Sequence, residues 1–296
     1  MTEITLFVNP AADRGRAAHA PEPAARVLRA AGFAVRTVAG RDAAEGLDRA
    51  RAAVASGTSA LVGVGGDGLA SLAFRAVAGT GVPLGLVAAG TCNDFARTLG
   101  LPLRDPRAAA RVIAGALRDG RIRSTDLARV GERLYGTVLG AGFDSRANAR
   151  GNRMRGPLGP LRYDLAALAE LAALRSVRFR ITLDGGKPRE LDTTLVAVGN
   201  GPSYGGGMRI CPGARPDDGL LDVTVVRACS RRTLLRLLAG VRRGTHLGNP
   251  AVDVHRAHTV ALEAPGVTAY ADGEPVGPLP LTVRSVPGAV RVLARQ

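Results

Sequence analysis

Short apolar runs alternate with amphipathic stretches over roughly the first third of the chain. Each apolar run is only a few residues long and is bounded by turn residues, which is typical of a strand. The predicted strands cover 4–9, 33–38, 59–64 and 83–90. The predicted helices cover 20–32, 41–57 and 69–79. This alternation predicts a parallel, doubly wound α/β sheet, which binds ligands outside the carboxyl ends of its strands.

The pattern changes after about residue 122. One further helix is predicted, over 162–176, and turn signals such as Asp272-Gly273 separate strand-like runs. The predicted strands cover 177–184, 191–200, 219–228, 251–264, 267–272, 280–285 and 289–294. We therefore expect an α/β domain at 1–122, completed by 285–296, and an antiparallel β-sandwich domain at 123–284. The active site is expected in the cleft between the two domains.

The net charge of +15 comes almost wholly from arginine. It fits either a bias in nucleotide composition or an attraction to anionic surfaces, and the total does not separate these explanations. The arginines cluster in two places. They are Arg146, Arg150, Arg153, Arg155 and Arg162, and then Arg227, Arg231, Arg232, Arg236, Arg242 and Arg243. Both clusters are suited to an anionic membrane surface. Nucleic acid is not expected, because no aromatic side chains interleave with the arginines.

Several classes of protein are excluded by absences in the sequence. Lys187 is the single lysine and lies in a predicted hairpin turn, so a phosphate-cradling Walker lysine and a protein-kinase lysine are both missing. No apolar run is long enough to span a bilayer, and the N-terminus lacks the basic region of a secretory signal. A cytoplasmic protein is therefore expected. The three cysteines share no metal-ligand spacing, which favours buried thiols in a reducing compartment.

The stretch GVGGDG at 63–68 matches the letters of a dinucleotide-binding turn. The position does not match, because the stretch follows the third strand, and no acid lies between Asp67 and Asp94 to hold a ribose. A tight strand-to-helix turn explains the glycines, with Asp67 as a helix cap. Taken alone, this stretch does not separate a structural turn from a functional one.

Two neighbouring loops favour a functional site. NPAADRG at 9–15 follows the first predicted strand, and GTCNDFAR at 90–97 follows the fourth. Parallel strands place all three loops at one edge of the sheet, where backbone N–H groups can surround a triphosphate. Asp67 and Asp94 then face the reacting phosphate through Mg²⁺ or ordered water, since carboxylates at a phosphate site require a cation between them.

These motifs, together with GAGFDS, GNGPSYGGGMRICPGARPDDGLLDV and Asp272-Gly273-Glu274, resemble the diacylglycerol kinase catalytic-domain family over nearly the whole chain. The family includes bacterial diacylglycerol, sphingosine and ceramide kinases. The resemblance implies an ATP-binding α/β domain, a lipid-binding β-sandwich and Mg²⁺-dependent phosphorylation of a lipid hydroxyl. It also implies peripheral action at an anionic membrane surface. A homodimer is compatible with the sequence, which does not decide the oligomeric state.

The same resemblance implies roles for individual residues. Glu274 matches the general base for the lipid hydroxyl, with Asp67 and Asp94 beside the phosphate. Asp218, with main-chain oxygens near Arg215 and Leu220, matches a structural Mg²⁺ site. The implied nucleotide-binding residues are Asn9, Pro10, Gly15, Thr37, Gly65, Gly66, Asp67, Gly68, Thr91 and Asn93.

One departure from the family pattern leaves alternatives open. After the Gly-Gly-Asp-Gly stretch the family continues with Thr-Leu-Asn-Glu, whereas this chain has Leu69-Ala70-Ser71-Leu72. Leu69 and Leu72 lack the expected hydroxyl and carboxylate, for which Ser71 compensates in part. A catalytically impaired binding protein of the same fold therefore remains an alternative to a lipid kinase. A kinase for a soluble hydroxyl compound such as NAD is another.

Overall fold

The computed structural model describes residues 2–8, 19–154 and 161–294. They form two compact units. The first comprises 1–127 and 286–296, and the second comprises 128–285. The sequence prediction placed the corresponding boundaries at 122/123 and 284/285.

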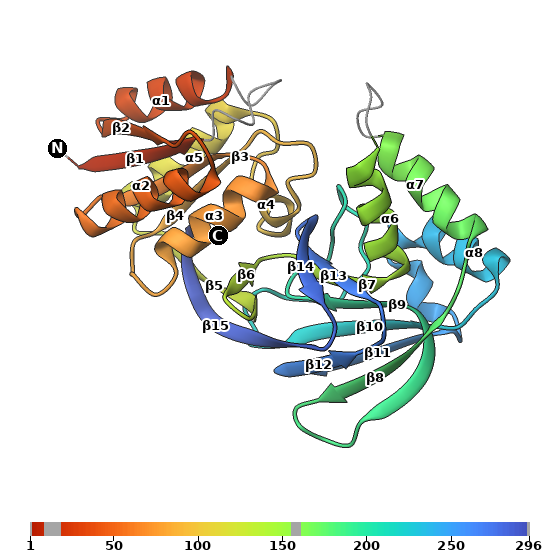
Figure 1. The fold of residues 1–296 in the computed structure, drawn as a ribbon. Coiled ribbons are helices and arrows are strands. Elements are labelled where there is room, and N and C mark those ends of the chain that lie inside the picture. The colour runs from red at the N-terminus through yellow and green to blue at the C-terminus, as the bar shows by residue number, and fades with distance from the viewer. Residues whose placement is uncertain (1, 9–18, 155–160, 295–296) are drawn as a thin grey trace. The chain divides into compact units, whose positions relative to one another are not determined.

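The first unit is an α/β fold (Figure 1). Its strands are β1 (Glu3–Val8), β2 (Ala34–Ala39), β3 (Ala60–Gly65), β4 (Leu84–Ala88) and the C-terminal part of β15 (Leu281–Leu293). Its helices are α1 (Pro21–Ala30), α2 (Ala43–Ala55), α3 (Asp67–Val77), α4 (Asp94–Thr98) and α5 (Pro106–Arg118). The strand order β2-β1-β3-β4-β15 is parallel throughout. The four strands and three helices predicted for this part are all present.

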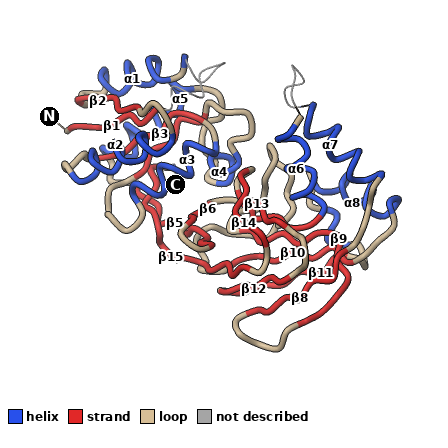
Figure 2. Tube along the Cα trace, viewed as in Figure 1, coloured by secondary structure: helices blue, strands red, loops and turns tan. Residues whose placement is uncertain are grey.

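The strand order positions the site of this unit. The chain order reverses between β1 and β3, and ligands in doubly wound sheets bind at that reversal, beyond the carboxyl ends of the strands. Helices cover both faces of the sheet, with α1 packed on α5 and α2 packed on α3 (Figure 2). The central strands β3 and β4 are consequently almost fully buried, as their near-continuous apolar runs predict.

Local capping explains where two of these helices begin. Asp42 accepts a hydrogen bond from the Glu45 amide at 2.9 Å, and the Glu45 carboxylate in turn accepts one from the Arg41 amide. Asp105 caps α5 in the same way, and Pro106 occupies its first position. The helix α5 was not assigned from the sequence.

The second unit is built on antiparallel strands. They are the last part of β5 (Ile122–Val130), β6 (Arg133–Tyr135), β7 (Val138–Gly142), β8 (Val177–Leu183), β9 (Arg189–Gly199), β10 (Leu221–Arg227), β11 (Val252–Ala257), β12 (Thr259–Glu263), β13 (Thr268–Ala271), β14 (Glu274–Pro278) and the first part of β15. The order runs β14-β13-β7-β9-β8-β12-β15, and β10 pairs with β9 and β11. The mixed α/β and β-sandwich fold class is thus as predicted.

This unit contains more helix than the sequence reading allowed. The predicted helix at 162–176 is present as α7 (Leu161–Ala172). Two other helices, α6 (Phe143–Arg153) and α8 (Arg231–Val241), and the short 3₁₀ helix Thr245–Gly248 were missed. The helix α6 has three arginines among its eleven residues and few apolar ones, which hid its pattern, whereas the amphipathic spacing of α8 was overlooked. Among the described residues, no helix combines the length and apolar character needed to cross a bilayer.

A buried carboxyl group lies at the start of α6. Asp144 is 8% exposed, and its Oδ1 accepts a hydrogen bond from the Ser145 amide at 2.8 Å. Its Oδ2 lies against Gly140, where a Cβ atom would come within 1.8 Å of that oxygen. Burial raises the pKa of Asp144 from 3.8 to about 7. The GFDS segment is therefore a packed structural element of this unit.

The raised pKa of Asp144 predicts a pH-dependent stability. A folded-state pKa above the unfolded value contributes stability that is fully present below about pH 4 and lost as pH rises to about 7. We expect Asp144→Asn to remove this decline, which amounts to up to about 4 kcal/mol. Denaturant unfolding at several pH values measures it, with the exposed Asp48→Asn as control. A decline in Asp144→Asn equal to that of the wild type would contradict the expectation.

Candidate active site

Two strand-to-helix turns meet at the carboxyl edge of the first unit's sheet. One joins β3 to α3, and the other joins the adjacent parallel strand β4 to α4. Gly66 and Gly90 form the contact between them. A Cβ atom on Gly90 would lie 2.4 Å from the Gly66 Cα, so the two backbones can approach only because both side chains are absent. The predicted meeting of these two glycine-containing loops is therefore present.

Asp67 fixes the second turn from the first. Its Oδ2 accepts a hydrogen bond from the Asn93 amide at 2.7 Å, and its Oδ1 accepts one from the Phe95 amide at 3.4 Å. These amides belong to the start of α4, whose early N–H groups have no partner within the helix. Below them, the rings of Phe74 and Phe95 pack edge to face, with centroids 4.6 Å apart. The carboxylate of Asp67 thus caps α4 although it belongs to α3.

Asn93 completes the turn in a left-handed backbone conformation, with φ of 56°. Its Oδ1 accepts a hydrogen bond from the Gly90 amide at 2.9 Å, and its Nδ2 donates to the Gly90 carbonyl at 2.8 Å. Asparagine tolerates this conformation better than most residues do. Asn93 is 3% exposed, so the structure assigns its side chain to holding the loop.

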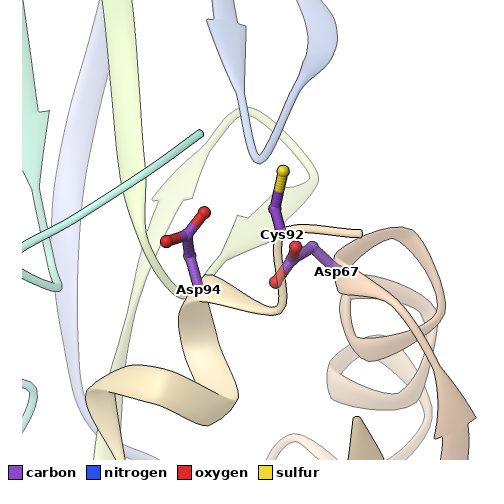
Figure 3. A group of neighbouring side chains, drawn as sticks. All are labelled: Asp67, Cys92 and Asp94. Atoms are coloured by element: carbon purple, nitrogen blue, oxygen red, sulfur yellow. The ribbon is translucent and has the colours of Figure 1, made fainter. Parts of the chain in front are cut away.

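Three side chains gather above this turn (Figure 3). Asp67, Cys92 and Asp94 each offer one ligand atom, and these atoms all lie within 4.8 Å of one another. The Asp94 carboxylate lies 3.7 Å from the Arg97 Nε. Two carboxylates at this spacing suit Mg²⁺, which uses one or two protein carboxylates and takes its other ligands from water and phosphate. The residues present therefore fit a magnesium ion.

Cys92 was not predicted to be near the site. Burial, followed by the charges of Asp94 and Asp67, raises the pKa of this thiol to about 11. The thiol is consequently protonated near neutral pH, and sulfur is a poor ligand for a hard ion such as Mg²⁺. The two carboxylates are the better ligands. The position of Cys92 between Thr91 and Asn93 was the only signal in the sequence.

Leu69 stands where the family pattern has a threonine. Its side chain is 6% exposed and packs over β3, where ideal Cβ positions on Gly63 and Gly65 lie 3.7 and 3.0 Å from its carbons. The pocket lined by these residues and by Leu86 and Ala96 holds about 10 Å³, room for a single water molecule. Leu69 therefore fills space beneath the turn and supplies no polar side-chain group.

The start of α3 provides backbone donors. Its first intrahelical hydrogen bond runs from the Ala70 amide to the Gly66 carbonyl at 3.1 Å. The amides of Gly68 and Leu69 precede that bond, at the positive end of the helix dipole. A helix start with these properties is a common binding position for phosphate.

The other residues predicted to bind the nucleotide do not all lie at these two turns. Thr91 lies in the β4–α4 turn and is exposed, and Ser71 is 8% exposed within α3. Thr37 is exposed on β2, paired with Leu6 of β1, and belongs to neither turn. The first loop, with Asn9, Pro10 and Gly15, lies outside the described residues.

Two arginines beside the β4–α4 turn were missed by the sequence reading. Arg97 donates to the Cys92 carbonyl at 3.2 Å, and Arg104 donates to the Thr91 carbonyl at 2.8 Å. Arg104 adopts a positive φ of 60°, which is uncommon for this residue type. Both side chains place positive charge near the loop in a chain that lacks a phosphate-binding lysine. Arg97 ends the GTCNDFAR stretch, but no role was assigned to it, and no short motif marks Arg104.

In the second unit, Glu274 begins β14 and is exposed at the tip of the β13–β14 hairpin. The preceding turn residues Asp272 and Gly273 have positive φ values of 49° and 82°, as expected for a tight turn. Asp272 accepts hydrogen bonds from the Gly136 and Thr137 amides, both at 3.2 Å, and from the Thr137 hydroxyl. Burial raises the pKa of Asp272. The hairpin tip is thus tied to the β6–β7 turn.

Asp218, the predicted ligand of a structural metal ion, has other partners. One carboxylate oxygen accepts a hydrogen bond from the Leu220 amide at 3.0 Å, and the other accepts one from the Arg256 guanidinium. Arg256 also pairs with Asp222, at 3.0 Å. Arg215, a further predicted contributor, pairs with Asp217 at 3.6 Å. In this arrangement the cation beside Asp218 is the Arg256 guanidinium, and these contacts leave the predicted main-chain oxygens near Arg215 and Leu220 unengaged.

Comparisons with known proteins assign both units to family models. The diacylglycerol kinase catalytic domain model matches residues 3–130, and the YegS C-terminal NAD kinase beta sandwich-like domain model matches residues 137–294. This chain combines an α/β unit, which has glycine turns and paired carboxylates, with a β-sandwich unit. These matches identify it as a phosphotransferase with a hydroxyl acceptor. The chain belongs to the diacylglycerol kinase catalytic-domain family.

Individual relatives agree with this assignment. The chain is 44% identical to a protein named diacylglycerol kinase from Mycobacterium tuberculosis, covering 98% of this chain and 94% of the relative. It is 32% identical to a "Probable lipid kinase YegS-like" of Pseudomonas fluorescens, covering 91% and 88%.

Solved structures extend the comparison to the fold. A crystal structure of a diacylglycerol kinase from Bacillus anthracis str. Sterne has a TM-score of 0.74 at 20% identity, covering 99% of this chain and 97% of that one. An Archaeoglobus fulgidus NAD kinase in complex with ATP has a TM-score of 0.56 at 10% identity, covering 99% and 94%. At these identities the likeness concerns the fold alone.

The Arg256 contacts predict that the stability of the second unit does not depend on Mg²⁺. We expect the same melting temperature for the wild type in Mg²⁺ and in EDTA. Arg256→Ala leaves Asp218 and Asp222 without their cation and is expected to cost about 2 kcal/mol, part of which millimolar Mg²⁺ restores. Arg180→Ala, which removes a 3.9 Å pair with exposed Glu263, serves as control. A rise in wild-type melting temperature with Mg²⁺ that Asp218→Asn abolishes would contradict this prediction.

Proposed function

We propose that this protein transfers the γ-phosphoryl group of ATP to a hydroxyl group of a lipid of the diacylglycerol class. The observation that carries the proposal is the pairing of the Asp67 and Asp94 carboxylates beside the start of α3. The 44% identity to a protein named diacylglycerol kinase supports the choice of acceptor. No specific observation favours NAD as acceptor.

The first unit would position the triphosphate. The amides at the start of α3 would bind phosphate oxygens, and Arg97 and Arg104 would supply the positive charge that a lysine supplies in other nucleotide-binding proteins. Asp94 and Asp67 would hold Mg²⁺, which neutralises developing charge on the transferred group. Since Asp67 also accepts hydrogen bonds from the amides of Asn93 and Phe95, its geometry is set before any ligand binds.

Glu274 would act on the acceptor. A hydroxyl nucleophile needs a proton acceptor within hydrogen-bond reach, and Glu274 is an exposed carboxylate on an anchored turn. In the transfer step, the lipid hydroxyl oxygen forms a bond to the γ-phosphorus, and Glu274 takes the hydroxyl proton. The bond from the γ-phosphorus to the β–γ bridging oxygen breaks, and ADP leaves with that electron pair. The contacts between Asp272 and the β6–β7 turn would hold Glu274 in place.

The location of the reaction follows from its acceptor. A long-chain diacylglycerol resides in a bilayer, so the protein is proposed to act in the cytoplasm as a peripheral protein at a membrane surface. The absence of a hydroxyl at Leu69 bears on the rate of transfer, because backbone amides and the two arginines would then hold the phosphate without a side-chain hydroxyl at this turn. The following experiment must therefore distinguish a kinase from a protein that binds these ligands without turnover.

A transfer assay tests the proposal with γ-labelled ATP, Mg²⁺ and short-chain dioctanoylglycerol in mixed micelles. We expect labelled phospholipid from the wild type. Glu274→Gln is expected to lower kcat by at least about 100-fold with little change in ATP affinity, since a general base contributes about that factor. Glu263→Gln, an exposed glutamate on β12, is the matched control and is expected to keep wild-type activity.

The other outcomes each have a distinct meaning. Binding of ATP or lipid without transfer would identify a binding protein and overturn the kinase proposal. Label on NAD, and not on lipid, would identify the soluble acceptor instead. A Glu274→Gln variant as active as wild type would remove Glu274 from the mechanism.

A further inference from the structure

The outward surface of α8 is basic and contains an exposed leucine. One side of this helix is buried in the second unit and contains Leu234, Leu237 and Val241. The positions on the opposite side of the helix follow a helical spacing and are exposed. They are Arg232, Leu235, Arg236 and Ala239. No Asp or Glu occurs between Asp222 and Asp253, so the sequence offers this surface no acidic neighbour along the chain.

The helix α7 contributes a second exposed apolar stripe. Leu165 is 45% exposed and Leu168 is 58% exposed, three residues apart on one side of the helix. Leu235 of α8 is 49% exposed. Of the five large apolar side chains that are exposed among the described residues, four lie on α7 or α8. Such a concentration marks an interaction surface, whereas single exposed leucines do not.

Direct contacts join the two helices into one surface. Arg231 of α8 donates from Nε to the Leu171 carbonyl at 3.2 Å and from Nη2 to the Ala172 carbonyl at 2.7 Å. These carbonyls end α7, so Arg231 satisfies the last turn of that helix. Figure 1 shows α7 and α8 side by side in the second unit. We call the exposed stripes of α7 and α8, with Leu165, Leu168, Arg232, Leu235 and Arg236, the α7–α8 face.

An open groove of about 770 Å³ adjoins the α7–α8 face, where α7 ends and α8 begins. Its lining contains three arginines and otherwise small or apolar residues. They are Leu174, Arg175, Ser176, Ala228, Cys229, Ser230, Arg231 and Arg232. A groove of this size accommodates a phosphorylated headgroup.

The two arginine clusters of the sequence differ in the partners they have. Arg146 and Arg150 pair with Glu170 at 3.3 and 2.7 Å, and Glu170 is only 5% exposed. Part of the first cluster is therefore neutralised inside the α6–α7 packing, and Arg155 lies outside the described residues. The second cluster includes the exposed Arg232 and Arg236, for which no acidic side chain lies on α8.

We propose that the α7–α8 face docks on an anionic lipid bilayer. Leu165, Leu168 and Leu235 enter the boundary between headgroups and acyl chains, and the arginines contact lipid phosphates. The exposed leucines among the arginines favour a bilayer over nucleic acid as the partner, because nucleic acid offers no apolar phase. Helices that lie at a membrane interface have an amphipathic, basic surface of this kind. The proposed lipid-kinase function supplies the reason for a bilayer, and the inference rests on it in that respect.

Vesicle sedimentation tests the docking surface with full-length protein and vesicles of phosphatidylcholine, with or without phosphatidylglycerol. The wild type is expected to bind the anionic vesicles and to be released by added salt. Arg232→Glu with Arg236→Glu is expected to bind at least about 30-fold more weakly, given the contribution of each basic residue near an anionic surface. Leu168→Ser with Leu235→Ser is expected to reduce binding to both vesicle types.

Matched controls lie elsewhere on the molecule. Arg51→Glu with Arg111→Glu reverses two exposed charges on α2 and α5. Val254→Ser changes the one large exposed apolar residue that the described part of the chain has outside α7 and α8, and this residue is 42% exposed. Both controls are expected to bind vesicles as the wild type does. Activity toward dioctanoylglycerol in neutral mixed micelles is expected to be unchanged in the α7–α8 variants, because none of these residues belongs to the proposed catalytic machinery.

The outcomes separate this inference from the proposed function. Vesicle binding that the α7–α8 variants lose, in a protein without kinase activity, would support docking and overturn the kinase. Kinase activity with vesicle binding unaffected by the variants would overturn docking alone. If the leucine variants change the oligomeric state in light scattering but not vesicle binding, the face is an interface between two copies of the chain, which also overturns the proposal.

Discussion

The candidate site depends on one carboxylate that joins two turns. Asp67 stands at the first position of α3, yet its oxygens accept hydrogen bonds from the amides that open α4. A carboxylate capping a helix start is favoured by the helix dipole as well as by the hydrogen bonds themselves. The contact can form only because Gly66 and Gly90 bring the two backbones together. This arrangement places the Asn93 and Phe95 amides of the β4–α4 turn.

The same arrangement explains why an acid belongs in a glycine-rich turn. In a dinucleotide-binding loop a carboxylate would repel the phosphate, whereas here it orders the neighbouring loop and, together with Asp94, offers oxygen ligands for a cation. A single side chain thereby links the packing of the sheet edge to the chemistry proposed for it. Leu69, which lacks the polar group of its family counterpart, instead fills the space below the turn. In the function proposed for this site, backbone amides and arginines would therefore make the contacts with phosphate.

The α/β unit could be predicted closely from the sequence because its strands are short, buried and bounded by glycines. Asp67 and Asp94 could be placed near one another because parallel strands end at the same edge of a sheet. The partners of Asp67 could not, since they depend on the left-handed backbone of Asn93 and on the contact between two glycines. Cys92 and Arg97 lie in the GTCNDFAR stretch and Arg104 lies outside it, but their positions beside the carboxylates and the loop carbonyls depend on the folded turn.

The β-rich unit was harder to predict, for physical reasons that can be named. Arginines on α6 lower the apolar content of that helix, whereas the amphipathic pattern of α8 is present in the sequence and was overlooked. Residues 251–264 look like one strand, although the chain divides there into β11 and β12. The neutralisation of Asp218 by Arg256 joins residues far apart in sequence, so the PDDGLLD segment alone indicated a metal ligand. The charge pattern did indicate the basic surface, but the pairing of Arg146 and Arg150 with Glu170 separates the two clusters only in the structure.

Asp67 is inferred to hold the start of α4 through two hydrogen bonds. The most direct test is amide hydrogen exchange in the wild type, Asp67→Asn and Asp94→Asn. The account predicts that the Asn93 and Phe95 amides exchange at least about 10-fold faster in Asp67→Asn, because each loses a charge-assisted hydrogen bond. In Asp94→Asn the same two amides should keep their wild-type protection. Wild-type protection of both amides in Asp67→Asn would contradict the account.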